Sequence, residues 1–252
     1  MYLLSGYFYF IPLTNLNSAK SLLQSLNHST ILKVNTMITN QSHSNNKNST
    51  DFALSLLKGR IGQSVIETYL VASGYEIYPY GYENNYVNIT RFVKKDQSDT
   101  TTTKIRSMPD LLVCDRTNNE RFLLQIKATN TRDESSYWIK KDNLDNYIKY
   151  WAEALLVVYF IRTGKIYCLK IADIKNPTEG LRPNSSENGF LLNLNDFHDF
   201  TEYFSHISSS QYTDMRRKIA SVLTDFSPIV TRFNRTKTNY NSQTRMSMEL
   251  SP

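Results

Sequence analysis

The stretch SMPDLLVCDRTNNERFLLQIKATN, residues 107–130, decides the fold. It contains two apolar runs, residues 109–115 and 121–129, joined by the polar sequence RTNNE. A pair of asparagines is favourable turn chemistry, so the two runs are predicted to form a β-hairpin. With the turn centred near residue 117 or 118, Asp110 lies opposite Gln125 or Ile126.

Three polar side chains are expected to meet at one end of this hairpin. Side chains alternate along a strand, so Gln125 and Lys127 project from one face while Ile126 points away. Asp110, Gln125 and Lys127 can therefore converge. A carboxylate, an amide oxygen and an ammonium are unfavourable in a hydrophobic core, but together they can bind a hard divalent cation such as Mg²⁺ and a phosphate.

The segments around the hairpin predict an α/β fold with a mixed central sheet flanked by helices. Apolar residues recur at helical spacing over residues 52–73, with Asp51 suited to cap the start and Gly74 the end. A helix is also expected over residues 142–154. Strands are expected at residues 75–80, 155–161 and 166–171, and residues 82–106 are expected to form a long loop or an irregular hairpin.

The chain is expected to contain one catalytic-sized domain with extensions at both ends. The predicted divisions are an N-terminal extension that is partly disordered (1–50), the α/β domain (51–175), a helical C-terminal extension (176–231) and a basic disordered tail (232–252). The tail from Arg232 is polar and lacks periodicity.

The composition suits an intracellular protein with an anionic partner. Lys and Arg number 29 against 23 Asp and Glu, for a net charge of +6. No apolar run reaches the roughly 18 residues needed to span a membrane, and no signal peptide is recognisable. Cys114 and Cys168 lie inside apolar runs, so both are expected to be buried and not to form a disulfide. This suits a reducing compartment. We therefore expect a soluble, cytoplasmic protein without a membrane partner.

The hairpin sequence resembles a known catalytic motif. The letters PD, fourteen further residues and then QIK are similar to the signature of the PD-(D/E)XK nuclease superfamily, with Gln125 in place of the second acid. Upstream, GRIGQSVIETYLVASGYEI supplies Glu67 on the first expected helix, followed by Gly74, as in archaeal Holliday-junction resolvase-like members. The resemblance covers residues 55–171 and implies a restriction-endonuclease-like core.

The resemblance also implies a role for each site residue. Asp110 would be the central metal ligand, and the amide oxygen of Gln125 and the main-chain carbonyl of Ile126 would be further ligands. Glu67 would bind the metal or a metal-bound water from the helix side. Lys127 would orient or help deprotonate the attacking water and stabilise charge on the phosphate. The implied activity is Mg²⁺- or Mn²⁺-dependent hydrolysis of DNA, with no small-molecule cofactor.

Other interpretations stay open at this point. Glutamine keeps an oxygen donor but removes a negative charge, so metal affinity should fall, or one ion may be held instead of two. The fold is also compatible with an inactive module that binds nucleic acid or protein, or with a structural protein of a virus or mobile element. Glu67 is equally compatible with an ordinary helix residue paired with Lys58 or Arg60. A homodimer is consistent with the resemblance.

Several residues are weaker candidates. Tyr147 and Tyr150 lie on the second expected helix, where packing of Tyr147 and Trp151 on the sheet is favoured over a role in the site. The basic residues of 91–106 and of 216–218 are compatible with a phosphate track, and His198 and His206 are expected to be structural. The secondary candidates just before the second helix are Lys140 and Lys141.

Overall fold

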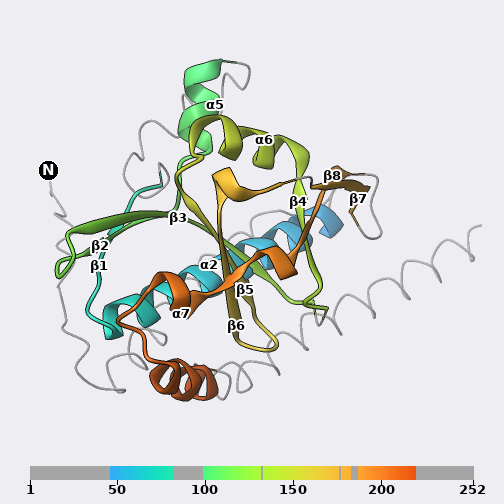
Figure 1. Ribbon diagram of the computed structural model, residues 1–252. Coiled ribbons are helices and arrows are strands. Elements are labelled where there is room, and N and C mark those ends of the chain that lie inside the picture. Colours follow the sequence, from blue (N-terminus) through green and yellow to red (C-terminus); the bar gives the residue numbers. More distant parts are fainter. Residues whose placement is uncertain (1–45, 82–98, 132, 176, 183–186, 220–252) are drawn as a thin grey trace, which may run out of the picture.

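The computed structural model describes residues 46–81, 99–131, 133–175, 177–182 and 187–219, with side chains from residue 55 onward (Figure 1). Its helices are α2 (Asn46–Ala72), α5 (Thr100–Arg106), α6 (Lys141–Tyr150) and α7 (Phe200–Tyr203), the short helices η1 (Ile171–Asp173) and η2 (Leu194–Asp196), and a helix over residues 209–219. Its strands are β1 (Glu76–Pro79), β2 (Leu111–Asp115), β3 (Glu120–Thr129), β4 (Ser136–Lys140), β5 (Leu155–Phe160), β6 (Lys165–Lys170), β7 (Thr178–Leu181), β8 (Asn188–Asn193) and β9 (His198–Asp199).

The centre of the fold is a six-stranded mixed sheet in the order β1-β2-β3-β5-β6-β9. Strands β3 and β5 are parallel, and the other neighbouring pairs are antiparallel. A parallel pair needs a crossover connection, and here the chain passes through β4 and α6 between β3 and β5. The expected mixed α/β architecture is therefore present.

The hairpin of β2 and β3 sets the position of Asp110. Leu111 pairs with Leu124, and the register runs on to Asp115 opposite Glu120. Asp115 stabilises the turn because its carboxylate accepts hydrogen bonds from the main-chain N–H groups of Thr117 and Asn118. One position before Leu111, Asp110 falls opposite Gln125, within the range that the sequence predicts.

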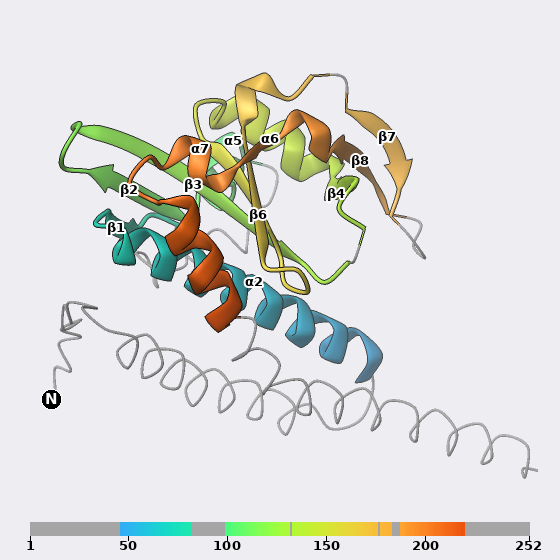
Figure 2. The same ribbon diagram turned by 60° about the horizontal axis from the view of Figure 1, so that its bottom comes forward.

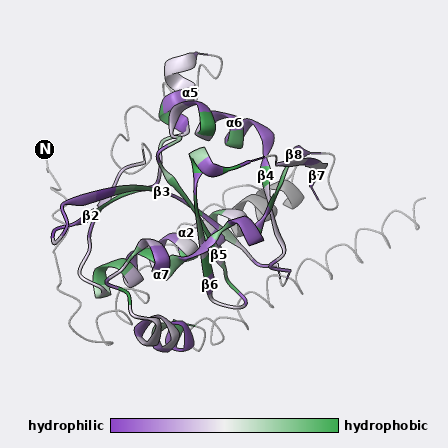
Figure 3. Cartoon of the chain, in the orientation of Figure 1, coloured by the Kyte–Doolittle hydropathy of each residue, from purple (hydrophilic) through white to green (hydrophobic). Residues whose placement is uncertain are grey.

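Two hydrophobic clusters cover opposite faces of the sheet. The first joins α2, α7 and the helix over residues 209–219 to the sheet, and the second joins α6 and the small sheet of β4, β8 and β7 to its other face (Figure 2). Strand β5 is buried throughout, and it contributes Val157 to the first cluster and Leu156 to the second. Hydrophobic residues accordingly concentrate on the central strands (Figure 3).

Helix α2 lies unusually close to β3. A Cβ atom on Gly62 would lie 2.7 Å from the Cβ of Ala128, so glycine is required for this approach. Gly74 follows the helix with φ of 89°, a left-handed conformation suited to glycine at a helix end. The predicted end of the helix is confirmed, whereas its start lies at Asn46 and not at Asp51.

Two expectations for the N-terminal half need correction. Residues Thr100–Arg106 form α5 inside the segment expected as a loop or hairpin, with the carboxylate of Asp99 accepting from the N–H of Thr102 as an N-cap. Threonine is a weak helix former, which is why the local sequence favours a loop. Strand β4 was also not expected. The other part of the segment, residues 82–98, lies outside the described residues.

The range expected as a helical C-terminal extension also contains strands. β7 and β8 pair with each other, β8 pairs with β4, and β9 joins the edge of the main sheet. These strands are short, and β8 and β9 pair with β4 and β6, which are distant in sequence, so local periodicity does not indicate them. The N-terminal and C-terminal segments expected as disordered fall mostly outside the described residues. Within the described part of the chain, no helix is long and apolar enough to cross a membrane.

Candidate active site

Asp110 is held by both its main chain and its side chain. Its N–H donates to the carbonyl of Leu124 at 2.8 Å, and its own carbonyl accepts from the N–H groups of Tyr80 and Gly81. Its carboxylate oxygen Oδ2 accepts two hydrogen bonds of 2.7 Å, from the N–H of Ile126 and from Nε2 of Gln125. The carboxylate is therefore fixed across the hairpin.

Gln125 is almost fully buried, with 4% of its surface exposed. Its amide nitrogen, and not its oxygen, faces Asp110 in this structure. The two ends of a carboxamide are nearly the same size, so a rotation exchanges donor for acceptor at small steric cost. Gln125 can thus hold Asp110 by donating, or offer an oxygen to a cation after such a rotation.

Glu67 reaches the same region from α2. Nε2 of Gln63 donates to its Oε1 at 2.9 Å, and Gln63 in turn accepts from Arg60. Burial raises the pKa of Glu67, and the negative charge of Asp110 raises it further, against the lowering effects of Gln63 and Arg60. The two carboxylates therefore repel each other, which is a typical feature of sites that bind cations.

Lys127 is positioned by α6, which covers the other face of the sheet from α2. Its Nζ lies 5.4 Å from the ring centroid of Tyr147 on α6. Burial lowers the pKa of Lys127, but Tyr147 and the charge of Asp110 together outweigh that effect and raise the pKa above its ordinary value. Phenols are neutral at pH 7, so Asp110 supplies the negative charge at that pH. The charge of Asp110 therefore favours the protonated form of Lys127.

Tyr137 adds a second phenol beside this lysine. Burial raises the pKa of Tyr137 to about 12, partly offset by the positive charge of Lys127. Tyr137 lies on β4, the strand that the sequence did not indicate, so its approach to the site was missed. Gln63 was missed too, although its spacing from Arg60 and Glu67 places all three on one face of α2.

The oxygen donors around Asp110 suit a hard cation. The described residues contain no group of three His, Cys, Asp or Glu side chains placed to hold a metal. The available donors are the carboxylates of Asp110 and Glu67, the amide of Gln125 and the carbonyl of Ile126. Mg²⁺ and Mn²⁺ accept this mixture and retain several waters, whereas zinc sites use nitrogen and sulfur ligands.

The weaker candidates lie in other contacts. Lys140 and Lys141 form ion pairs with Glu187 and Glu179 of the small sheet. His206 hydrogen-bonds Asp115 at the turn end of the hairpin. Three further candidates have partners of their own: His198 pairs with Glu202, Arg216 donates to the carbonyl of Thr163, and Lys218 pairs with Asp214.

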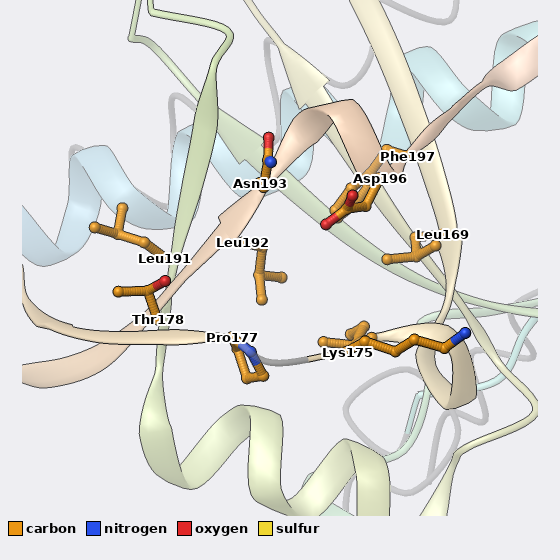
Figure 4. Close-up of a pocket in the computed structure, with 10 residues that line it drawn as sticks. Leu169, Lys175, Pro177, Thr178, Leu191, Leu192, Asn193, Asp196 and Phe197 are labelled. Carbon is orange, nitrogen blue, oxygen red and sulfur yellow. The ribbon is translucent and has the colours of Figure 1, made fainter.

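A hollow elsewhere on the molecule is distinct from this site. It is lined by side chains of β6, β8 and the segment before β7, including Leu169, Pro177 and Leu192 (Figure 4). Its volume is about 50 Å³, well below the roughly 300–1,000 Å³ of typical ligand pockets. None of the candidate site residues lines it, so we assign it no ligand.

Comparisons with known proteins give little further information. A scan against protein-family models finds no match, and a search of the curated proteins finds no significant match. Among solved structures, the chain is similar to D212, a nuclease from a fusellovirus, at 15% identity and a TM-score of 0.30. The match covers 75% of this chain and 100% of that one.

Proposed function

We propose that this protein is a metal-dependent endonuclease that hydrolyses DNA phosphodiester bonds with a restriction-endonuclease-like core. The observation that supports this best is the fixed carboxylate of Asp110, which meets Gln125 and Ile126 of β3 and interacts electrostatically with both Glu67 and Lys127. These residues come from α2, the position just before β2, and β3, in the order that the PD-(D/E)XK resemblance implies.

The cation would be Mg²⁺ or Mn²⁺. Asp110, Glu67, the amide oxygen of Gln125 and the main-chain carbonyl of Ile126 would hold it. When bound, such an ion supplies a polarised phosphate oxygen and a more acidic water. It would also relieve the repulsion between the two carboxylates, which in its absence raises the pKa of Glu67.

Lys127 would stabilise charge and would not act as the base. A general base must be unprotonated near the working pH, and the neighbours of Lys127 raise its pKa. A fixed ammonium beside the phosphate is suited to the negative charge that develops in the transition state. Tyr147 would act as a positioning residue, because the ammonium of Lys127 lies over its ring.

The test is cleavage of labelled linear duplex, single strand and four-way junction DNA with Mg²⁺, Mn²⁺ or chelator. We expect metal-dependent cutting that Asp110→Asn and Lys127→Ala each reduce by at least about a hundredfold. Asp145→Asn and Lys149→Ala serve as matched controls, because both residues are exposed on α6 and are expected to leave cutting unchanged. Cutting that survives chelator, or that survives both site substitutions, refutes the proposal.

A second candidate is a catalytically inactive module of the same fold that binds nucleic acid or a protein partner. One observation favours it, since Gln125 already gives Oδ2 of Asp110 a hydrogen-bond donor that requires no cation. The same experiment separates the two functions. The inactive module predicts DNA binding that is equal in Mg²⁺ and in chelator, with no cleaved product.

A further inference from the structure

An aromatic pair is attached to the segment that carries Asp110. The rings of Tyr80 and Trp151 meet edge to face, with centroids 6.1 Å apart and planes at 87°. Tyr80 is tied to the site because its N–H donates to the Asp110 carbonyl at 3.0 Å. Trp151 ends α6, and its indole N–H donates to Ser107, three residues before Asp110. Both rings are partly exposed.

The chemistry of Trp151 restricts what it can bind. Its one hydrogen-bond donor is already used by Ser107 at 3.1 Å. The indole therefore offers a ligand only its π face. Lys104 of α5 lies over this ring, with Nζ 5.8 Å from the centroid, and is itself exposed to solvent. The lysine chain can swing aside and leave the ring face to a flat ligand.

The charge beside the rings favours an anionic ligand. Neither Lys104 nor Arg106 forms an ion pair with any carboxylate in the described part of the chain. Both belong to α5, which leads directly into the segment that carries Asp110. A flat ring beside two cations that no described carboxylate pairs with matches the combination of stacking and phosphate contact that binds single-stranded nucleic acid.

We propose that Trp151, Tyr80 and Lys104 form a stacking site for an unpaired DNA base next to the phosphate at Asp110. The base stacks on the indole, and Lys104 contacts the adjoining phosphate. A base inside continuous duplex is stacked on its neighbours and cannot reach the ring without being unpaired. The preferred substrate is therefore a strand with an unpaired nucleotide beside the cleaved bond. This inference rests on the proposed nuclease function for its ligand.

The test measures binding in chelator, where the proposed enzyme does not cut. A labelled single strand and the matching duplex are titrated with the wild type, Trp151→Ala, Trp151→Phe and Lys104→Ala. We expect Trp151→Ala to weaken single-strand binding roughly tenfold, as base stacking on one aromatic ring implies, with little effect on duplex. Trp151→Phe keeps a stacking face and should retain most of the binding. Lys104→Ala should weaken both ligands alike.

A spectroscopic measurement gives an independent readout. In Trp138→Phe, Trp151 is the remaining tryptophan, and single-stranded DNA should quench its fluorescence whereas duplex should not. The stacking site is refuted if Trp151→Ala weakens the binding of single strand and duplex equally. It is also refuted if the fluorescence of Trp151 is not quenched in a protein that binds single strand. Either result leaves the nuclease proposal standing. A wild type that binds neither ligand and cuts no DNA overturns both.

Discussion

At the scale of single residues, Gln125 is the side chain that separates the two candidate functions. It is buried at the position where the PD-(D/E)XK motif has an acid, and its amide donates to Asp110. A glutamate there would add negative charge for a cation but would repel Asp110 when no cation is bound. In the proposed enzyme, Gln125 would therefore lower the metal affinity and stabilise the site when no metal is bound.

Gln125→Glu should make the protein bind Mg²⁺ more tightly and depend on it more. Added ligand charge strengthens cation binding, so the Mg²⁺ concentration that half-maximally raises the melting temperature should fall roughly tenfold. In chelator the variant should melt below the wild type, because the donor to Asp110 is lost and two carboxylates face each other. A variant whose melting temperature does not change with Mg²⁺ concentration would show that residue 125 does not face a cation.

Glu67 makes the stability of the metal-free protein depend on pH. Because burial and Asp110 raise the pKa of Glu67 in the fold, its stabilising protonated form is fully present below the ordinary glutamate pKa and is lost as pH rises through the raised value. In chelator, Glu67→Gln should therefore raise the melting temperature at pH 7 and leave it unchanged at the acid end. Mg²⁺ should stabilise the variant less than the wild type.

The exposed Glu120 supplies the control for this measurement. Glu120→Gln should leave the pH dependence of melting close to that of the wild type. A Glu67→Gln protein whose melting curve follows the wild type at every pH in chelator would mean that Glu67 lies in an ordinary surface environment, as an isolated helix residue would.

At the scale of elements, the site depends on how closely α2 packs on β3. Glu67 comes from the helix and Gln125 from the strand, so the distance between the two elements sets the geometry between their side chains. Gly62 permits that distance, because its missing Cβ leaves room for Ala128. The glycine lies little more than one helical turn before Glu67, on the same helix.

Gly62→Ala should destabilise the protein and impair the site together. Its new Cβ would lie 2.7 Å from the Cβ of Ala128, and such overpacking typically costs about 1–3 kcal/mol in the free energy of unfolding. Gly59→Ala is the matched control, since a Cβ there meets nothing within 4 Å and should stabilise the helix by about 0.5–1 kcal/mol. Urea denaturation of both variants measures the difference, and equal shifts would contradict the close packing.

At the scale of the whole molecule, one strand joins both hydrophobic clusters. Strand β5 directs Val157 into the cluster under α2 and Leu156 into the cluster under α6, and all its residues are buried. Truncating side chains on either face of β5 therefore also destabilises the cluster on the other face, because both clusters pack on the same strand. We expect the described core to unfold as a single cooperative unit.

Leu156→Ala and Val157→Ala test this cooperativity from opposite sides. Leu156→Ala should lower the free energy of unfolding by about 2–5 kcal/mol, with a smaller loss for the shorter valine. Helix content by circular dichroism follows α2, and the fluorescence of Trp138 and Trp151 follows the opposite layer. In each variant the two denaturation curves should shift together. Curves that separate would show that the layers unfold independently.

The sequence predicted those features that depend on short-range patterns. Residues 109–129 alternate and turn within one hairpin, so the meeting of Asp110 with Gln125 follows from strand periodicity and the turn. The buried run of β5 and the end of α2 at Gly74 are equally local. α5 was missed because its threonines are weak helix formers. β4 and β8 were missed because both are short and pair with each other although about fifty residues separate them in the sequence.

By itself, the sequence determined the hairpin, the central helix and strands, and the position of Asp110 opposite Gln125, because turns and periodicity are properties of neighbouring residues. Only the tertiary structure decided that Tyr147 and Tyr137 surround Lys127, that Gln125 donates to Asp110, and that Trp151 lies beside Tyr80. These contacts join segments that the chain brings together only when both faces of the sheet are packed, and packing depends on all the layers at once.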